Sequence, residues 1–340
     1  MTKLTVSTSP HIHHEATTSR IMLDVLIALI PAFAAAIMIF GVRAAAVTCV
    51  CVASCVFFEW IFEKITKREK TIGDYSACIT GVLLAFNLPV TIPIWQAVFG
   101  SAVAIILVKQ LFGGLGKNFA NPAITARVVM FLAFSATMTN WASPYAETSW
   151  WIYPIDSVAA NLGAAGGAMD ALTGATAGAD AVTGATPLVL LGQGRFDALP
   201  SVWHMILGVR GGSLGETSNI ALLIGGIYLM ARRVISWHTP LTYIAVVTGL
   251  SGLLGAEPVY HMLAGGLFLG AFFMATDYVT APQTNLGRII FGAGAGLFTV
   301  LFRIYGNYPE GVSFAILLMN ILTPYINRIT ETKPLGAVKS

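Results

Sequence analysis

The fold class is decided by a stretch near the N-terminus that reads Ile21-Met-Leu-Asp-Val-Leu-Ile-Ala-Leu-Ile-Pro-Ala-Phe-Ala-Ala-Ala-Ile-Met-Ile-Phe-Gly41. The single ionisable residue in it is Asp24. An apolar stretch of about 20 residues crosses a bilayer core of about 30 Å when it is helical. This one is too long for the apolar region of a signal peptide, and no cleavage site of small residues follows it. The sequence therefore predicts a transmembrane helix over residues 21–41.

The composition of the whole chain extends this prediction. Hydrophobic residues make up 56% of the 340 residues and charged residues 10%, against roughly 25% charged in soluble domains. The mean hydropathy is +0.75. These values exclude a soluble globular protein and a disordered chain, and they predict an all-α polytopic membrane protein. The net charge of +3 gives no reason to expect nucleic-acid binding. The cysteines lack zinc-site or disulfide spacing, so we interpret them as packing residues.

Ten stretches are candidate membrane spans, several of them short or interrupted by Gly and Pro. They cover residues 21–41, 44–62, 77–90, 95–112, 122–139, 218–231, 239–256, 259–276, 289–305 and 311–327. With the N-terminus inside, 14 of the 19 Lys and Arg residues fall in inner segments. Four fall in outer segments, namely Arg43, Arg195, Arg210 and Arg303. This bias follows the positive-inside rule and predicts that both termini are cytoplasmic.

One connection is much longer than the others. Residues 140–217 are rich in Gly, Ala and Thr and contain no span, and a long loop of this kind is usually functional or disordered. It separates five spans from five, so the second half enters the membrane from the opposite side, as an inverted repeat requires. We therefore expect tails over 1–20 and 330–340, halves over 21–139 and 218–329, and an extracytoplasmic loop over 140–217.

The third span of each half ends in a related pattern. The first reads Asn87-Leu-Pro-Val-Thr-Ile-Pro93, and the second reads Asp277-Tyr-Val-Thr-Ala-Pro282. Pro and polar residues at the end of a span indicate either a broken helix that lines an internal site or an ordinary helix stop. Both interpretations stay open from the sequence.

A heptapeptide occurs twice in the long loop, with a spacing of ten residues. Asp170-Ala-Leu-Thr-Gly-Ala-Thr176 is followed by Asp180-Ala-Val-Thr-Gly-Ala-Thr186, and the second copy alone continues into Pro187-Leu188. Both copies keep Asp and both Thr residues in register, which low-complexity drift would not require. Gly184 and Ala185 place little bulk before Thr186, and Pro187 favours extended geometry there. A hydroxyl on such a chain is suited to modification.

The second copy resembles the acceptor motif of flavin transferases, which join the phosphate of FMN to the last Thr hydroxyl. In particular, Thr-Gly-Ala-Thr-Pro-Leu is similar to the motif in the family of the Rnf complex D subunit and the B subunit of the sodium-pumping NADH:quinone reductase. Three further stretches carry the resemblance, namely Ser9-Pro-His-Ile-His13, Gly116-Lys-Asn-Phe-Ala-Asn-Pro-Ala123 and Ala275-Thr-Asp-Tyr-Val-Thr-Ala-Pro282. The short N-terminal tail favours the Rnf subunit. Ala120 and Tyr278 differ from the usual family residues, Phe and Pro.

The resemblance implies covalent FMN, held by a phosphoester on Thr186. Asp180, Thr183, Gly184 and Ala185 would then form the rest of the acceptor motif read by an FMN transferase. Thr176 is the competing acceptor, and we favour Thr186 because Pro187-Leu188 follows it. In this interpretation the flavin supplies the redox chemistry and the protein sets its position and potential.

The implied function is that of a membrane subunit in an ion-translocating ferredoxin:NAD⁺ oxidoreductase of the bacterial inner membrane. Electron flow through it would be coupled to Na⁺ or H⁺ movement, with other Rnf-type membrane and cytoplasmic subunits and membrane lipid as partners. The sequence has no Gly-x-Gly-x-x-Gly after a strand pattern and no Cys motif for an iron–sulfur cluster, so donors and acceptors belong to partners. The alternatives are a quinone-reductase B subunit and a urea-channel-like permease without redox function.

A second polar group is expected at the inner face. Lys117, Asn118 and Asn121 precede the fifth span, and Asp277 reaches the same face by the predicted topology. Ionisable groups at a span end suggest function by default. The resemblance implies a second, unattached flavin of riboflavin type, which we place near these residues. The alternative is a helix cap at Asn121 with Lys117 extending to the membrane surface.

Other ionisable residues have simpler interpretations. Asp24 and Arg127 lie inside predicted spans and should face the bundle interior. The run from Glu63 to Lys70 is expected to be an interface anchor on the cytoplasmic side. The tail histidines, His11, His13 and His14, are more typical of a solvated segment than of a metal site.

Overall fold

The described part of the chain is helical, as predicted. The computed structural model describes residues 17–68, 71–142, 186–195, 197, 199–216, 218–306 and 311–331. The elements before the long connection are α1 (Thr18–Phe40), α2 (Val42–Thr66), η1 (Ile72–Asp74), α3 (Ser76–Phe86), α4 (Ile94–Ala102), the π-helix η2 (Val103–Gln110), α5 (Pro122–Ala133) and α6 (Ser135–Met138). Within the predicted loop 140–217 lie α9 (Pro187–Gly192), α10 (Val202–Leu207) and η5 (Leu214–Glu216). After it come α11 (Asn219–Ala231), α12 (His238–Leu253), α13 (Pro258–Leu263), α14 (Leu267–Leu269), the π-helix η6 (Gly270–Met274), α15 (Asn285–Ile304) and α16 (Val312–Thr330).

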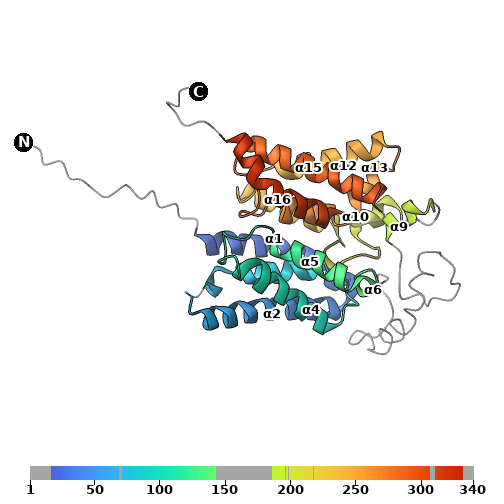
Figure 1. Cartoon of the computed structure of the whole chain (residues 1–340). Helices are drawn as coiled ribbons and strands as arrows, with labels where there is room; N and C mark the ends of the chain where they lie inside the picture. The colour runs from blue at the N-terminus through green and yellow to red at the C-terminus, as the bar shows by residue number, and fades with distance from the viewer. Residues whose placement is uncertain are drawn as a thin grey trace, which may run out of the picture.

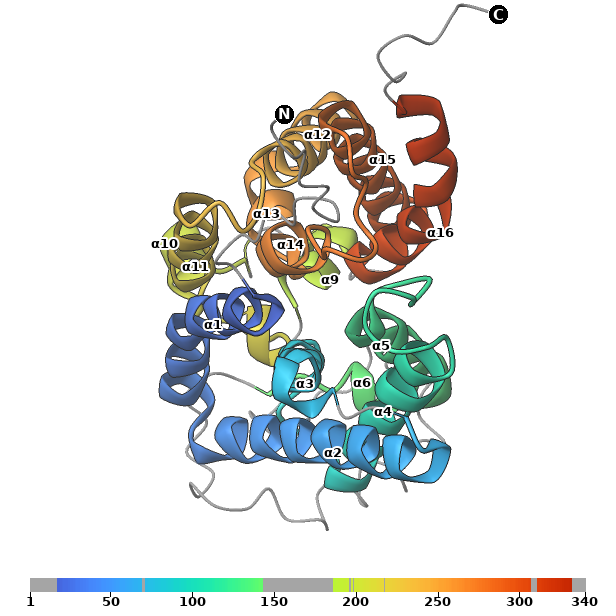
Figure 2. The ribbon, with the colours of Figure 1, turned by 90° about the vertical axis from the view of Figure 1, so that its left-hand side faces the viewer.

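The two halves of the chain form two layers whose long helices run in roughly the same direction (Figure 1). Seen along the helices, α1 to α6 lie in one group and α9 to α16 in the other (Figure 2). The groups meet where α1 packs on α11 and where α5 packs on α16. One apolar cluster continues through both groups and includes Leu29, Leu84, Phe291 and Ile316.

The first predicted span is a helix with slightly different ends. Thr17 caps α1, and its hydroxyl accepts a hydrogen bond from Arg20 N at 3.3 Å, which satisfies one of the free amides of the first turn. Helix α1 ends at Gly41, whose φ of 74° is easily reached only without a side chain, and α2 begins at the next residue. The predicted range 21–41 is therefore correct in type and shifted by a few residues.

In the part of the chain that the structure describes, four helices are long and apolar enough to cross a bilayer, namely α1, α2, α15 and α16. The other predicted spans also coincide with helical segments, but these are shorter. Helix α3 has 11 residues, which span about 16 Å at 1.5 Å per residue. This is shorter than a bilayer core of about 30 Å. Nine of the 11 residues are buried, so other parts of the protein surround this short helix. The ten crossings and the inverted repeat stay predictions.

The polar pattern at the end of α3 belongs to a broken, protein-enclosed segment. The Arg43 guanidinium, at the start of α2, donates to the carbonyl oxygens of Val90 at 2.9 Å and Ile92 at 3.0 Å. In the other half, Arg288 Nε donates to the Pro282 carbonyl oxygen at 3.2 Å. These bonds satisfy carbonyl groups that leave the helical pattern, which favours the broken-helix interpretation over a plain stop.

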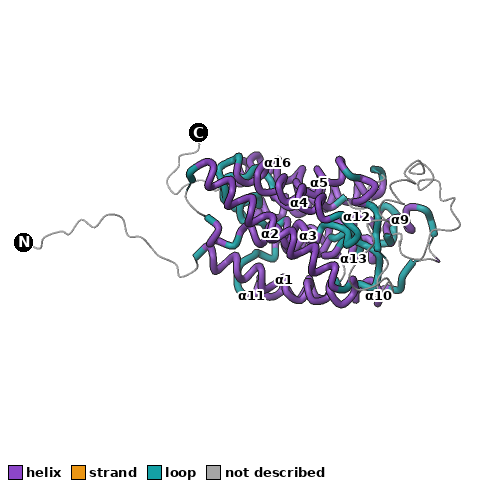
Figure 3. The backbone as a smooth tube through the Cα atoms, turned by 90° about the horizontal axis from the view of Figure 1, so that it is seen from below, coloured by secondary structure: helices purple, strands orange, loops and turns teal. Residues whose placement is uncertain are grey.

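The ends of the described chain lie at one end of the bundle. The start of α1 and the end of α16 lie on the left in both Figure 1 and Figure 3, whereas α9 lies on the right. Thr186, at the start of α9, is thus remote from both chain ends. The membrane face on which the long connection lies stays a prediction, as does its sidedness.

Candidate functional site

Thr186, inside the predicted loop 140–217, is the first described residue after residue 142, and it caps α9. Its backbone is extended, with φ −68° and ψ 151°, as expected before Pro187. Its Oγ1 accepts a hydrogen bond from Val189 N at 3.4 Å. The accessible hydroxyl suggested by the sequence is not what the structure shows, because Thr186 is only 4% exposed. The rest of the motif, Asp180, Thr183, Gly184 and Ala185, and the competing Thr176 lie outside the described residues.

The geometry at Thr186 is compatible with a phosphoester. The hydroxyl oxygen acts as an acceptor toward Val189, and an ester oxygen keeps a lone pair for that role. Pro187 has no amide hydrogen to satisfy at the first position of the helix. The cap contact at Oγ1 therefore does not depend on the hydroxyl hydrogen that a phosphoester would replace.

Two of the arginines expected in outer segments, Arg303 and Arg210, are packed against protein, and Arg303 lies beside α9. A Cβ at Gly265 would lie 2.4 Å from Arg303 Nη2 and 2.7 Å from Leu188 Cδ1, so these two side chains meet at that glycine. Arg303 donates to the carbonyl oxygens of His261 at 2.5 Å and Ala264 at 2.8 Å. Arg210 is 4% exposed and donates to the Glu216 carbonyl oxygen at 2.9 Å. Counting charges by loop could not reveal this burial.

The intramembrane ionisable residues face the interior, as predicted. Asp24 is 8% exposed, and its carboxylate pairs with Arg232 at 3.2 Å and accepts a hydrogen bond from the Tyr228 hydroxyl at 3.0 Å. Arg127 donates to Asn87 Oδ1 and to Ser313 Oγ, both at 2.9 Å. These contacts join helices from the two halves, because Asn87 follows α3 and Ser313 lies on α16.

A pocket brings together three of the four residues expected at the inner face. Asn118, Asn121 and Asp277 line a pocket of about 80 Å³ that is partly open to solvent. Lys117 does not line it and is exposed. Its apolar wall includes Met22, Ile79, Leu83, Phe272 and Phe273. The pocket therefore combines a flat aromatic and aliphatic lining with a few polar groups, as small-molecule sites commonly do.

The polar residues of this inner pocket have different roles. Asn121 Oδ1 accepts from Ala123 N at 3.0 Å and Ile124 N at 3.3 Å, so Asn121 caps α5 as the alternative interpretation proposed. Asn118 donates to the Ala120 carbonyl oxygen at 3.4 Å, while its buried Oδ1 has no partner among the described residues. A buried amide oxygen without a donor is suited to receive one from a ligand, such as a flavin ring N–H.

Asp277 lies at the edge of the same pocket, directly after η6. Its carboxylate accepts from Thr280 Oγ1 at 3.2 Å and Val279 N at 3.5 Å. Burial raises the pKa of the Asp277 carboxyl, and these hydrogen bonds act in the opposite direction. Tyr278, the departure from the family pattern, donates from its hydroxyl to the Val234 carbonyl oxygen and so ties this segment to the end of α11.

A buried ion pair next to this pocket was not predicted. Lys109 Nζ lies 2.6 Å from Glu59 Oε1, and the two side chains are 2% and 0% exposed. Each residue falls inside a predicted span, at 95–112 and 44–62, and an ionisable residue inside a span was the signal that could have identified it. Glu63, expected in a solvated anchor, is 3% exposed.

Comparison with known sequences assigns the family. The pattern of the NQR2, RnfD, RnfE family matches residues 5–336. The chain belongs to this family. The resemblance found in the motifs is thereby confirmed over nearly the whole length, and the broken segments, the inner pocket and the α9 cap all lie within the matched range.

Named relatives of this family member are similar along their full lengths. The D subunit of the Na⁺-translocating ferredoxin:NAD⁺ oxidoreductase complex of Acetobacterium woodii is 44% identical over 338 residues, covering 99% of this chain and 96% of that protein. The D subunit of the proton-translocating complex of Clostridium ljungdahlii is 38% identical, covering 98% and 96%. The D subunit of the ion-translocating oxidoreductase complex of Escherichia coli K12 is 37% identical, covering 97% and 98%. The first of these names specifies Na⁺ and the second specifies protons, so sequence similarity alone does not identify the coupling ion of this chain.

Proposed function

We propose that this chain is the D-type subunit of an ion-translocating ferredoxin:NAD⁺ oxidoreductase complex and that it holds FMN as an ester on Thr186. Its family and its near-complete coverage of relatives with that name support the assignment. The observation that carries the flavin proposal is the cap geometry of Thr186, whose Oγ1 accepts from Val189 and needs no hydrogen of its own.

Attachment forms a P–O bond between Thr186 Oγ1 and the phosphate of the FMN unit of an activated flavin donor. The bond from that phosphate to the donor's leaving group breaks, and the hydroxyl proton passes to the leaving group or to a base. The extended backbone, fixed by Pro187, presents the oxygen at the start of α9. Since Thr186 is buried in the folded chain, we expect an FMN transferase to act before α9 packs against α13, or while α9 is displaced. Asp180 and Thr183 to Ala185 form the recognition motif in this proposal.

The inner pocket is proposed to hold a second flavin, of riboflavin type, without a covalent bond. Asn118 Oδ1 and Asp277 supply the polar contacts, and Phe272 and Phe273 supply an apolar wall. The flavins supply electron transfer, while the chain positions them and limits water access. Electron donors and acceptors reside in other Rnf-type subunits, and the complex sits in the bacterial inner membrane and moves Na⁺ or H⁺.

Flavin fluorescence of the denatured polypeptide in a gel tests the attachment. Thr186→Val, nearly isosteric but without a hydroxyl, should lose the fluorescence, and Thr176→Ala should keep it. Peptide mass mapping then locates the FMN mass. FMN found on residue 176 would show that the other repeat is the acceptor. A wild-type chain without covalent flavin would instead favour the permease alternative.

A further inference from the structure

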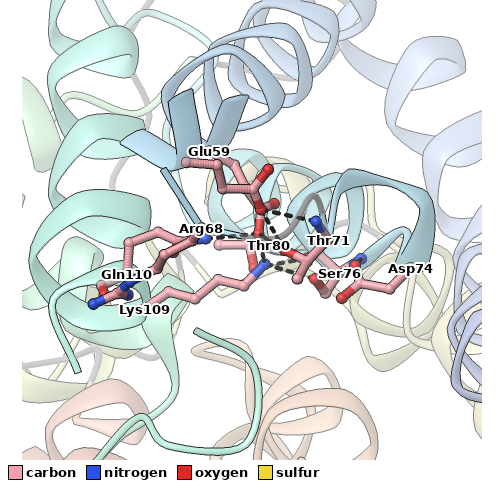
Figure 4. A network of polar contacts seen from close by, with 9 residues as sticks. Glu59, Arg68, Thr71, Asp74, Ser76, Thr80, Lys109 and Gln110 are labelled. Atoms are coloured by element: carbon pink, nitrogen blue, oxygen red, sulfur yellow. Dashed lines mark hydrogen bonds and ion pairs between the residues drawn. The ribbon is translucent and has the colours of Figure 1, made fainter. Parts of the chain in front are cut away.

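Hydrogen-bonded side chains from α2, η1, α3 and η2 form a polar network (Figure 4). This network lies between the inner pocket and a second pocket at the end of α2. The second pocket is lined by Trp60, Glu63, Lys64, Lys67 and Arg68. Between the pockets, Thr71 Oγ1 lies 2.5 Å from Glu63 Oε1 and 3.1 Å from Glu59 Oε1. Lys109 Nζ lies 2.6 Å from Glu59 Oε1 and 2.6 Å from Ser76 Oγ, and both Lys109 and Ser76 line the inner pocket.

We propose that Glu63, Thr71, Glu59 and Lys109 form a proton relay that supplies the inner pocket from the α2 end of the bundle. The relay rests on the proposed flavin in that pocket, because reduction of a flavin ring takes up protons together with electrons from partner subunits. It assigns a catalytic step to residues that neither flavin site otherwise uses.

A proton on one of the two glutamates gives each of the two contacts at Thr71 a hydrogen of its own. The Thr71 hydroxyl has one hydrogen, yet its oxygen lies within hydrogen-bond distance of a carboxyl oxygen from each of Glu59 and Glu63. With both carboxyls ionised, one of the two short contacts would join two oxygens with no hydrogen between them. A proton on either carboxyl supplies the missing hydrogen.

The surroundings place that proton on Glu63. Glu59 Oε1 accepts from Lys109 Nζ and from Gln110 Nε2 at 2.9 Å, which are donors that favour an ionised carboxylate. Among the described residues, the ion pairs are Lys109–Glu59 and Arg232–Asp24, and neither includes Glu63. The buried Glu63 Oε2 also has no partner there. Glu63 Oε1 accepts from the Thr71 amide, a neutral donor, whereas Glu59 Oε1 accepts from the Lys109 ammonium, so we assign the shared proton to Glu63.

Other charged or titratable groups surround the relay and set its resting state. They are Arg68 after α2, Asp74 in η1, Cys55 in α2 and Cys78 in α3. Arg68 donates to the Gln110 carbonyl oxygen at 2.8 Å, and Asp74 accepts from Ser76 Oγ at 2.5 Å. The Ser76 hydroxyl therefore donates its hydrogen to Asp74, and its oxygen accepts a hydrogen bond from Lys109.

The proton moves in two balanced exchanges. Glu63 gives its proton to Thr71 Oγ1 while Thr71 gives its own hydrogen to Glu59 Oε1, so one O–H bond breaks and one forms at Thr71. Lys109 then releases a proton into the inner pocket and takes the proton of Glu59. Water in the α2-end pocket restores the proton of Glu63. Lys109 lies in the π-helix η2, a form often found at functional sites.

Proton uptake by the purified whole complex, followed with a pH-indicator dye after reduction with dithionite, tests the relay. Thr71→Val removes the hydroxyl and keeps the backbone amide that donates to Glu63 Oε1 at 3.0 Å. It should slow proton uptake by about tenfold or more, since positioned proton transfer contributes at least that much. Thr71→Ser, the matched control, should stay close to wild type. Normal uptake in Thr71→Val, with wild-type flavin content, would overturn the relay alone.

Two further measurements separate the relay from the flavin proposal. In infrared spectra of the resting oxidised complex, Glu63→Gln should remove a carboxylic-acid C=O band that the wild type shows, and identical spectra would refute the proton assigned to Glu63. Acid extraction should release a flavin from the wild-type complex and from each variant. If the wild-type complex contains no releasable flavin, the proposal that the inner pocket holds a flavin is wrong. The relay then has no flavin to which it could deliver protons.

Discussion

Asn118 and Asp277 line one pocket although they belong to opposite halves of the chain. Asn118 precedes α5, and Asp277 follows η6, so the pocket exists only where the two groups of helices meet. A ligand held between them would therefore contact both halves of the subunit at once.

Removing the Asp277 carboxylate should empty this pocket without affecting covalent FMN. Asp277→Ala is expected to lower the acid-releasable flavin of the purified complex by about tenfold, the loss of one polar contact of about 1.4 kcal/mol. Fluorescence of the denatured chain should be unchanged. Lys117→Ala is the control, because Lys117 is exposed and outside the pocket. Equal losses in both variants would contradict the placement.

The contact between α1 and α11 should not tolerate a methyl group at Gly225. A Cβ there would lie 2.2 Å from the Ala28 carbonyl oxygen, so the helices would have to separate. We expect Gly225→Ala to destabilise the chain by about 1–3 kcal/mol. The readout is the thermal aggregation temperature in detergent. Gly249→Ala, on α12 with nothing within 4 Å, should have little effect. A wild-type temperature for Gly225→Ala would refute this packing.

Breaking the buried pair of Glu59 and Lys109 from one side should be more costly than removing both charges. Lys109→Met leaves Glu59 as an unpaired buried carboxylate and should cost about 3–5 kcal/mol. The double variant Glu59→Gln, Lys109→Met should recover most of that loss. Detergent unfolding curves of the three proteins measure the difference. A double variant less stable than Lys109→Met would mean that the charges act independently.

The predicted sidedness is open to cysteine labelling. The native cysteines are first replaced, since Cys49 is exposed and would react. An impermeant thiol reagent added to intact cells should label Ser201→Cys, in the outer segment, and should not label Lys67→Cys, at the end of α2. Labelling of residue 67 without residue 201 would reverse the orientation.

Several features could be predicted from the sequence because they depend on local chemistry. The helical class follows from long apolar runs, since a backbone in lipid must satisfy its own hydrogen bonds. The extended backbone at Thr186 follows from the ring of Pro187, and the cap at Asn121 follows from an amide placed just before Pro122. The inward direction of Asp24 and Arg127 follows from the cost of exposing charge to lipid. Each of these arguments needs only a residue and its near neighbours in the chain.

Tertiary packing alone decided which distant groups meet. Lys117 and Asn118 are adjacent in the sequence, yet only Asn118 reaches the pocket, because the turn before α5 directs one inward and one outward. The sequence assigned Arg303 to an outer segment, whereas packing against α13 buries its guanidinium against backbone carbonyls. Charge and hydropathy along a chain report how each segment meets lipid or water. They carry no information about which helix is its neighbour, and that choice brings Glu59 of α2 and Lys109 of η2 together.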